Sequence, residues 1–301
     1  MRWLAGLFLW LAAAAPALAT GGGRFVEHPA VASTNIPPPH VVVWLPPGYE
    51  AGGRRYPVVY MHDGQNLFFP ERSGYNKVWA ANKAALRLVA AAKVAPFIIV
   101  GVDHPGKARY QQYFPAKVPS PALRKQIESF AGPLSGDAYI RFLADELKPF
   151  IDRTYRTRPE PRFTAVAGSS MGGLISLYAL AERPDTFGRA AGVSTHLALI
   201  GPDELKKMPG LAESIIGDWR QYLYRQLGPP KGRKLWMDHG TATLDAHYAP
   251  FQRPVDAELR RIGWGPESFQ SRVYQGAEHE ENAWAARLDD IFGWLLSDWR
   301  P

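Results

Sequence analysis

The chain has 301 residues, a formal net charge of +7 at pH 7, 46% hydrophobic residues and no cysteine. The lack of cysteine excludes disulfides, a thiolate nucleophile and cysteine-based metal sites, and basic pairs scattered without a cluster are typical of a solvated surface rather than a nucleic-acid-binding face. A chain of this length suits one large α/β domain that buries a substantial core.

The first residues have the pattern of an export signal. Met1-Arg2 is a short positive start, residues 3–15 are an apolar run, and Ala17-Leu18-Ala19 is an A-x-A cleavage site. We therefore expect a signal peptide over residues 1–19, cleavage after Ala19, and an exported protein that is periplasmic or secreted; the alternative is a retained N-terminal anchor helix. No later stretch approaches the ~20 apolar residues of a membrane span, so none is expected.

After a loose lead-in rich in Gly and Pro over residues 20–40, strand and helix signals alternate along the chain. Two early apolar runs separated by a turn predict a pair of strands that can add an antiparallel edge. In chain order we expect strands at 40–45 and 56–61, a helix at 77–92, a strand at 97–103, a helix at 136–154, strands at 163–167, 190–194 and 234–237, a helix around 256–262, a strand at 269–274 and a helix at 282–299.

This alternation predicts the fold class α/β, with a mainly parallel central sheet covered by helices on both faces. The sequence has no internal repeat, and we expect residues 20–301 to form a single domain. Two stretches, 115–135 and 197–231, do not fit the core pattern and follow the ends of strands, where α/β folds place binding loops. The second stretch is a candidate cap insertion. Its aromatic residues Trp219, Tyr222 and Tyr224 indicate either a small cap over the site or packing against the body.

A candidate nucleophile lies between a predicted strand and a predicted helix, in the segment Gly168-Ser-Ser-Met-Gly172 of the form G-x-S-x-G. In this context the turn holds the central serine in a strained conformation above the sheet, and the helix N-terminus points at the reacting centre. Glycines are expected on either side because a Cβ would clash in so tight a turn. We therefore expect Ser170 to be the nucleophile; the alternative is a Gly- and Ser-rich turn that only reverses the chain.

A serine nucleophile needs a histidine base that is held by an acid. In α/β-hydrolases the chain order is nucleophile, acid, histidine, and His279 lies in a loop after the last predicted strand, where that fold places its base. The acid is Asp238, at the end of a strand, or Asp245, in the loop beyond it; we favour Asp245 because a loop residue can reach across to His279. The two backbone N–H donors of an oxyanion hole are expected from Met171 and Gln65.

Four motifs occur in order along the chain: Tyr60-Met-His-Asp-Gly-Gln-Asn-Leu-Phe68, Gly168-Ser-Ser-Met-Gly-Gly173, Gly240-Thr-Ala-Thr-Leu-Asp245 and Glu278-His-Glu-Glu-Asn-Ala-Trp284. Together they resemble the putative-esterase family of α/β-hydrolases, which includes feruloyl, acetylxylan and enterobactin esterases, S-formylglutathione hydrolase and mycolyltransferases. The resemblance runs from about Val41 to Trp294.

That resemblance implies an α/β-hydrolase fold, a triad of Ser170, Asp245 and His279, and an oxyanion hole formed by Gln65 and Met171. One further segment, Arg109 to Pro115, is similar to a family pattern R-x-x-E-Y-x-P but carries Gln112 in place of Glu. An ion pair made by that Glu is therefore not expected here.

These observations predict an exported serine carboxylic-ester hydrolase that acts through an acyl-enzyme on a small-molecule or carbohydrate-linked ester. No metal ion and no organic cofactor is required, and no partner nucleic acid is expected. The alternatives are an acyltransferase that uses the same triad on a sugar or lipid hydroxyl, and a non-catalytic carbohydrate-binding protein of the same fold. The sequence leaves the oligomeric state open.

Overall fold

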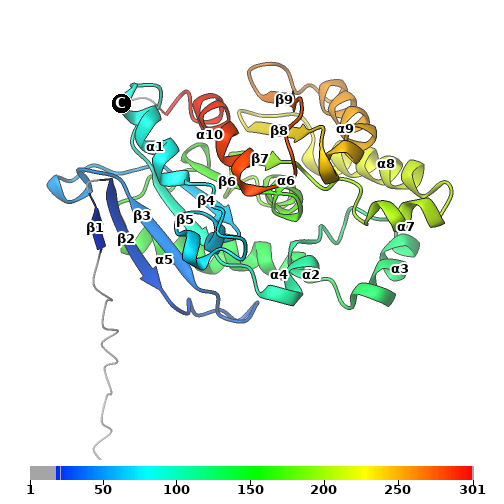
Figure 1. The fold of residues 1–301 in the computed structure, drawn as a ribbon, viewed down its shortest axis with the longest axis horizontal. Coiled ribbons are helices and arrows are strands. Elements are labelled where there is room, and N and C mark those ends of the chain that lie inside the picture. The colour runs from blue at the N-terminus through cyan, green and yellow to red at the C-terminus, as the bar shows by residue number, and fades with distance from the viewer. Residues whose placement is uncertain (1–17, 21, 300–301) are drawn as a thin grey trace, which may run out of the picture.

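Apolar runs that are buried along their whole length form the centre of one sheet. In the computed structural model, which describes residues 18–20 and 22–299, the sheet has nine strands within those residues (Figure 1). The predicted signal peptide lies outside the described residues except for its last two, which begin the first strand. The strands are β1 (Leu18–Thr20), β2 (Gly23–His28), β3 (Val41–Leu45), β4 (Val58–His62), β5 (Ile98–Val102), β6 (Thr164–Ser169), β7 (Arg189–Val193), β8 (Lys234–Gly240) and β9 (Phe269–Tyr274).

The strand order is β1-β2-β3-β5-β4-β6-β7-β8-β9, and the neighbours from β5 to β9 all pair in parallel. The predicted fold class is confirmed, but the expected pairing of the first two predicted strands is wrong: β3 pairs antiparallel with β2 and β5, whereas β4 lies between β5 and β6. The reason is burial on both faces, since Val58 and Tyr60 pack on one side of β4, and Val59 and Met61 on the other. Such a strand suits the centre of the sheet.

The lead-in is more ordered than its composition predicts. Over Gly23–His28 it forms β2, where Phe25 and Val26 pack on opposite faces of the sheet. Farther along, Ser33, Thr34 and Asn35 are tied to the helical segment 136–154 through hydrogen bonds to Glu146. The prediction of a loose lead-in is therefore wrong, because partners distant in sequence order it.

Helices cover both faces of the sheet. One face carries α1 (Ala81–Ala90) and α10 (Glu281–Leu295), which pack against each other; the other carries α4 (Gly136–Arg141), the π-turn η5 (Phe142–Leu147), α5 (Lys148–Thr154), α6 (Met171–Glu182), α8 (Leu211–Tyr222) and α9 (Ala249–Arg261). The shorter α2 (Arg109–Tyr113), α3 (Pro121–Ala131) and α7 (Pro202–Lys207) lie in connections. Among the described residues, no helix combines the length and apolar character needed to cross a bilayer.

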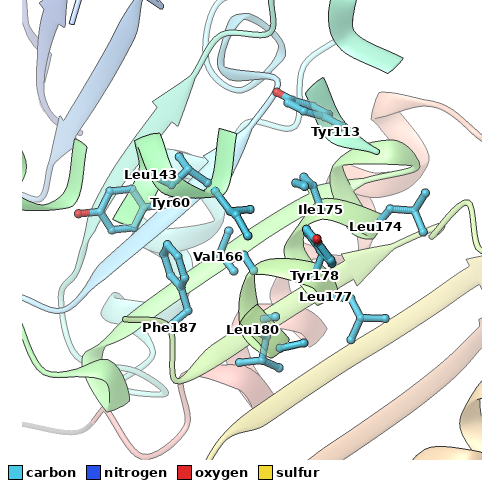
Figure 2. Packing of buried hydrophobic residues seen from close by; sticks show 14 of the residues in the cluster. Tyr60, Tyr113, Leu143, Val166, Leu174, Ile175, Leu177, Tyr178, Leu180 and Phe187 are labelled. Atoms are coloured by element: carbon cyan, nitrogen blue, oxygen red, sulfur yellow. The ribbon is translucent and has the colours of Figure 1, made fainter. Parts of the chain in front are cut away.

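The helix that follows β6 is buried on all sides. Every residue of α6 from Met171 to Ala181 is buried, and Figure 2 shows Leu174, Ile175 and Leu177 of this helix in the same apolar cluster as Val166 of β6. A helix that is apolar all round belongs inside a large domain. The turn between β6 and α6 is thus held between a central strand and a central helix, which fixes the backbone of Ser170.

The segment 197–231 packs against the body of the domain. It forms α7, α8 and the π-turn η7 (Leu223–Leu227), at the end of the molecule away from β1–β3 (Figure 1). Trp219 is fully buried and donates its indole N–H to the Leu197 carbonyl, and Tyr222 is buried beside it. These two aromatic residues therefore pack the segment against the domain. A role of the segment as a cap over the site stays a prediction.

Candidate active site

Ser170 occupies the sharp turn between β6 and α6. Its backbone has φ 56° and ψ −119°, a strained conformation for a residue with a side chain. A Cβ added at Gly168 would lie 2.9 Å from the Gly172 carbonyl carbon and 2.9 Å from Cδ2 of His62. Close packing on both sides of the turn therefore requires glycine at 168 and keeps the serine strained, as the G-x-S-x-G pattern predicts.

His279 and Asp245 come together across two loops. The imidazole Nδ1 lies 2.6 Å from Oδ1 of Asp245, and the backbone N–H of His279 donates to Oγ1 of Thr243. His279 lies in the loop between β9 and α10, and Asp245 in the 3₁₀ turn η8 (Thr243–His247) that follows β8. A carboxylate in this position fixes the tautomer and orientation of the ring and leaves Nε2 free to accept a proton.

The second oxygen of Asp245 is held as firmly as the first. Its Oδ2 accepts hydrogen bonds from Oγ of Ser194 and from the backbone N–H of Gly240, each at 2.5 Å. Burial by itself raises the pKa of Asp245, but the hydrogen bonds from His279, Ser194 and Gly240 outweigh it and lower that pKa below its usual value. Asp245 therefore stays ionised opposite the histidine.

Asp238 has a different set of partners. It is fully buried and accepts hydrogen bonds from Arg287 (2.7 Å), the Trp236 indole (2.8 Å) and the backbone N–H of Ser194 (3.1 Å). Burial raises the Asp238 pKa, and the Arg287 charge opposes that shift. Of the two aspartates, the structure brings Asp245 to His279 and Asp238 to a buried arginine.

Ser170 and His279 both line a cavity of about 640 Å³. Its wall combines polar and apolar surface and contains two ion pairs, Arg109 with Asp63 and Lys77 with Glu280. Within the described part of the chain no hydrogen bond joins the Ser170 side chain to His279. The assignment of these residues as a catalytic triad stays a prediction.

The two expected oxyanion donors follow the neighbouring parallel strands β6 and β4. Met171 is the first residue of α6, so its backbone N–H has no acceptor within the helix. Gln65 lies in the 3₁₀ turn η2 (Gly64–Asn66) after β4, where a Cβ on Gly64 would come within 2.7 Å of the Gly101 backbone. The Gln65 side chain accepts a hydrogen bond from the backbone N–H of His104 (3.2 Å), which ties η2 to the loop after β5. The role of both N–H groups stays a prediction.

The Arg109 segment makes an ion pair, although not the one that a Glu at position 112 would make. Arg109 donates to both carboxylate oxygens of Asp63 at 2.6 and 2.7 Å, and its guanidinium stacks 5.1 Å from the centre of the Tyr113 ring. Asp63 follows β4 with φ 56° and lies beside the turn that carries Ser170, with Oδ2 3.3 Å from a Cβ built on Gly172. Gln112 is buried nearby.

Several residues of this site escape sequence reasoning. They come from three places in the fold, and none belongs to a recognisable spacing pattern: Ser194 and His196 from the loop after β7, Tyr248 from the end of η8, and Arg287 from α10. Their only sequence signal is position: Ser194 and His196 follow the end of a strand, where functional loops begin in α/β folds.

Comparison with known proteins agrees with the geometry. Residues 37–295 match the family model described as Putative esterase. "Uncharacterized protein YbbA" of Bacillus subtilis is 22% identical over 253 residues, which cover 84% of this chain and 90% of that protein. An endo-1,4-beta-xylanase/feruloyl esterase of Xylanibacter ruminicola is 30% identical over 187 residues, and the match spans 58% of this chain but only 22% of that protein.

Solved structures show the same fold. An IroE-like serine hydrolase from Shewanella oneidensis superposes with a TM-score of 0.67 at 19% identity, over 91% of this chain and 80% of that one. At this identity the likeness supports the α/β-hydrolase fold and leaves the substrate undetermined.

Proposed function

Because the chain belongs to the Putative esterase family, we propose that it is an exported serine carboxylic-ester hydrolase that acts through an acyl-enzyme. The observation that carries the proposal is the 2.6 Å contact between His279 and Asp245 at a cavity that Ser170 also lines from a strained turn. A base held by a buried carboxylate beside such a serine is the arrangement that activates a hydroxyl nucleophile.

In the proposed reaction, His279 takes the proton of Ser170 as Oγ attacks the ester carbonyl carbon. The N–H groups of Gln65 and Met171 stabilise the oxyanion, and Asp245 stabilises the imidazolium. The C–O bond to the alcohol then breaks, and His279 protonates the leaving oxygen. Water attacks the acyl-enzyme with His279 again as the base, which releases the acid and restores Ser170.

The character of the cavity favours hydrolysis over acyl transfer. Its wall carries Asp63, Arg109, Lys77, Glu280 and Glu281, and charged groups of this kind keep water in a site. An acyltransferase must exclude water from its acyl-enzyme. We therefore place transfer to a sugar or lipid hydroxyl second.

The substrate class that we propose is a small-molecule or carbohydrate-linked ester. Tyr75 lies at the cavity with most of its ring exposed, and Trp284 lies against His279, so the wall combines aromatic rings with carboxylates. Aromatic faces with polar side chains suit an aryl or sugar group. The feruloyl esterase named in the Xylanibacter relative supports this choice.

Export is the remaining part of the proposal, and it rests on the N-terminal sequence. Expression of the full chain in a bacterial host, followed by cell fractionation and N-terminal sequencing, tests it. We expect the mature protein outside the cytoplasm with Thr20 as its first residue. Recovery of the uncleaved chain in the cytoplasm would contradict export without affecting the chemistry.

The activity is tested with acetate, butyrate and octanoate aryl esters and methyl ferulate. We expect Ser170→Ala to lower kcat by several orders of magnitude, and Ser176→Ala, which removes a buried hydroxyl elsewhere on α6, to keep it. Equal turnover by wild type and Ser170→Ala would exclude this mechanism. Silence in both proteins would favour acyl transfer, assayed with added alcohols, or carbohydrate binding without turnover.

A further inference from the structure

A buried arginine lies close to Asp245, the carboxylate that orients His279. Arg287 of α10 pairs with Asp238 through Nη1 at 2.7 Å, and its Nη2 lies 3.8 Å from Oδ2 of Asp245. Among the described residues, Nη2 and Nε of this guanidinium have no hydrogen-bond partner. A buried guanidinium with free N–H groups attracts any carboxylate within reach, because unpaired charged donors are costly inside a protein. Asp245 therefore has two competing partners, the histidine and the arginine.

One hydroxyl contacts both Asp245 and Arg287. Ser194 is fully buried in the loop after β7, and its Oγ lies 2.5 Å from Oδ2 of Asp245 and 3.2 Å from Nη1 of Arg287. A third partner is the indole Nε1 of Trp284, at 3.0 Å from the same oxygen. The backbone of Ser194 has φ 44°, a conformation that is unfavourable for a residue with a side chain. The fold thus holds this hydroxyl in place at a cost in backbone strain.

The chemistry of these three partners fixes the direction of each hydrogen bond. A guanidinium and an indole N–H are donors only, so Arg287 and Trp284 occupy the two acceptor positions of the Ser194 oxygen. The hydroxyl has one proton left to donate, and the remaining partner, Oδ2 of Asp245, is an acceptor. The Ser194 O–H therefore points at Asp245, with both of its lone pairs already in use.

Trp284 connects this hydroxyl to the cavity. Its ring lines the cavity together with Ser170 and His279, and stands at 86° to the His279 ring with the centres 5.1 Å apart. Trp284 and Arg287 lie one turn apart on α10, the helix that follows the His279 loop. One helix therefore supplies both donors to Ser194 and one wall of the base, so the hydroxyl, the acid and the base are fixed relative to the same element.

We propose that Ser194 is a positioning residue that holds the Asp245 carboxylate at His279 and prevents it from turning to Arg287. With Oδ2 held by the Ser194 O–H and the Gly240 N–H, Oδ1 stays directed at Nδ1 of His279. Ser194 is buried behind the cavity wall, so it acts through Asp245 and not on a substrate. Its effect on the rate rests on the proposed function, whereas the placement of the Asp245 carboxylate does not.

The first test compares Ser194→Ala with Ser194→Gly, which also lacks the hydroxyl but suits the positive φ. We expect both to lower kcat on an aryl acetate by about ten- to hundredfold, because a hydrogen bond to a charged group is lost, with KM little changed. Ser176→Ala, which removes a buried hydroxyl on α6, is the matched control and should keep kcat. A Ser194→Gly protein with the kcat of wild type would show that the hydroxyl is dispensable and overturn the proposal.

A second test separates action through Asp245 from a general loss of structure. Ser194→Ala is introduced into wild type and into Asp245→Asn, where the carboxylate that it positions is already absent. We expect the full loss of kcat in the wild-type background and less than about a threefold further loss in Asp245→Asn, since residues that act as a unit are not additive. Equal fold losses in the two backgrounds would show that Ser194 does not act through Asp245, and would overturn the proposal.

Crystal structures of wild type and Ser194→Ala separate this proposal from the proposed function, because they need no substrate. In the variant we expect Oδ2 of Asp245 to move from 3.8 Å to within about 3.2 Å of Nη2 of Arg287, and the contact between Asp245 and His279 to lengthen. A carboxylate that keeps its 2.6 Å contact with His279 in the variant overturns the positioning role, whatever the activity. A displaced carboxylate in a protein that turns over no ester supports the positioning role and counts against the esterase.

Discussion

At the scale of single residues, Asp238 of β8 and Asp245 of η8 have different main partners within one buried hydrogen-bond network. Asp245 accepts hydrogen bonds from His279, Ser194 and Gly240, which keep its pKa low, and the Arg287 guanidinium lies farther off, 3.8 Å from its Oδ2. Asp238 lies directly against the Arg287 guanidinium, and one hydroxyl, that of Ser194, joins the two sides by donating to Asp245 and accepting from Arg287 (3.2 Å). The same residue type therefore orients a base in one place and neutralises a buried charge in the other.

Substitution with asparagine separates these roles. We expect Asp245→Asn to lower kcat by roughly 10⁴-fold, because an amide supports the wrong tautomer of His279, while the protein stays folded. Asp238→Asn removes the carboxylate charge 2.7 Å from the buried Arg287 and leaves only that of Asp245, 3.8 Å away, so it should cost about 3–5 kcal/mol of unfolding free energy. Steady-state kinetics and urea unfolding measure the two effects. A larger loss of kcat in folded Asp238→Asn than in Asp245→Asn would contradict the proposed acid.

At the scale of elements, the helical segment 136–154 shows how one residue reshapes a helix. Its ends agree with the sequence prediction, but a π-turn interrupts it between α4 and α5. Pro149 has no N–H for the carbonyl four residues earlier, and the N–H of Lys148 bonds to the Leu143 carbonyl, five residues back. The turn carries Glu146, whose carboxylate accepts hydrogen bonds from the lead-in at Ser33, Thr34 and Asn35.

The contribution of Glu146 to stability should depend on pH. Slight burial raises its pKa, but the hydrogen bonds from the lead-in dominate and lower it from 4.5 to about 2. A folded-state pKa below the unfolded value adds stability that is fully present above pH 4.5 and is lost as the pH falls toward 2. We expect Glu146→Ala to lower Tm by about 2–4 °C at pH 7 and by less at pH 3.

Thermal melts of Glu146→Ala and wild type across this pH range are the measurement. Asp145→Ala, which removes a neighbouring carboxylate from an ion pair with Arg183 near the surface, is the control and should change Tm little. A Tm difference for Glu146→Ala that stays constant from pH 7 to pH 3 would show that its carboxylate charge is not the stabilising feature.

At the scale of the whole molecule, the sheet separates two apolar cores, and the end of the chain completes one of them. Trp299 is buried among Phe97, Phe163 and the last turn of α10, and donates its indole N–H to the Arg162 carbonyl (2.7 Å). Arg189 of β7 stacks on its ring. This residue connects the start of β6, the middle of the sheet and α10.

Removal of this side chain should therefore affect the whole domain. We expect Trp299→Ala to lower the free energy of unfolding by about 3–5 kcal/mol, because loss of the buried indole leaves a cavity in this core. Trp294→Ala, at a half-buried position on α10, should cost clearly less. Chemical denaturation of wild type and the two variants measures these losses of unfolding free energy. Equal losses in the two variants would contradict the expected role of Trp299.

Local sequence patterns predict most of the elements and the strained turn at Ser170. Apolar runs of strand length predicted β5 through β9 within a few residues, and the strand-turn-helix context of Gly168 to Gly172 predicted the strain at Ser170. These features are local: a short stretch of side chains dictates its own backbone and which faces must be buried. The order nucleophile, acid, histidine along the chain further limits the candidates for the base and the acid to a few residues.

The packing of the layers, in contrast, selects which distant groups meet. It placed β4 in the centre of the sheet, brought Asp245 rather than Asp238 to His279, and brought the backbone N–H of His196 to the Ser170 carbonyl. Each of these contacts joins loops whose approach depends on how the layers pack, and a difference of a few ångströms changes the hydrogen-bond partner. No local pattern carries that information, because the free energy that selects such contacts comes from packing and desolvation across the whole domain.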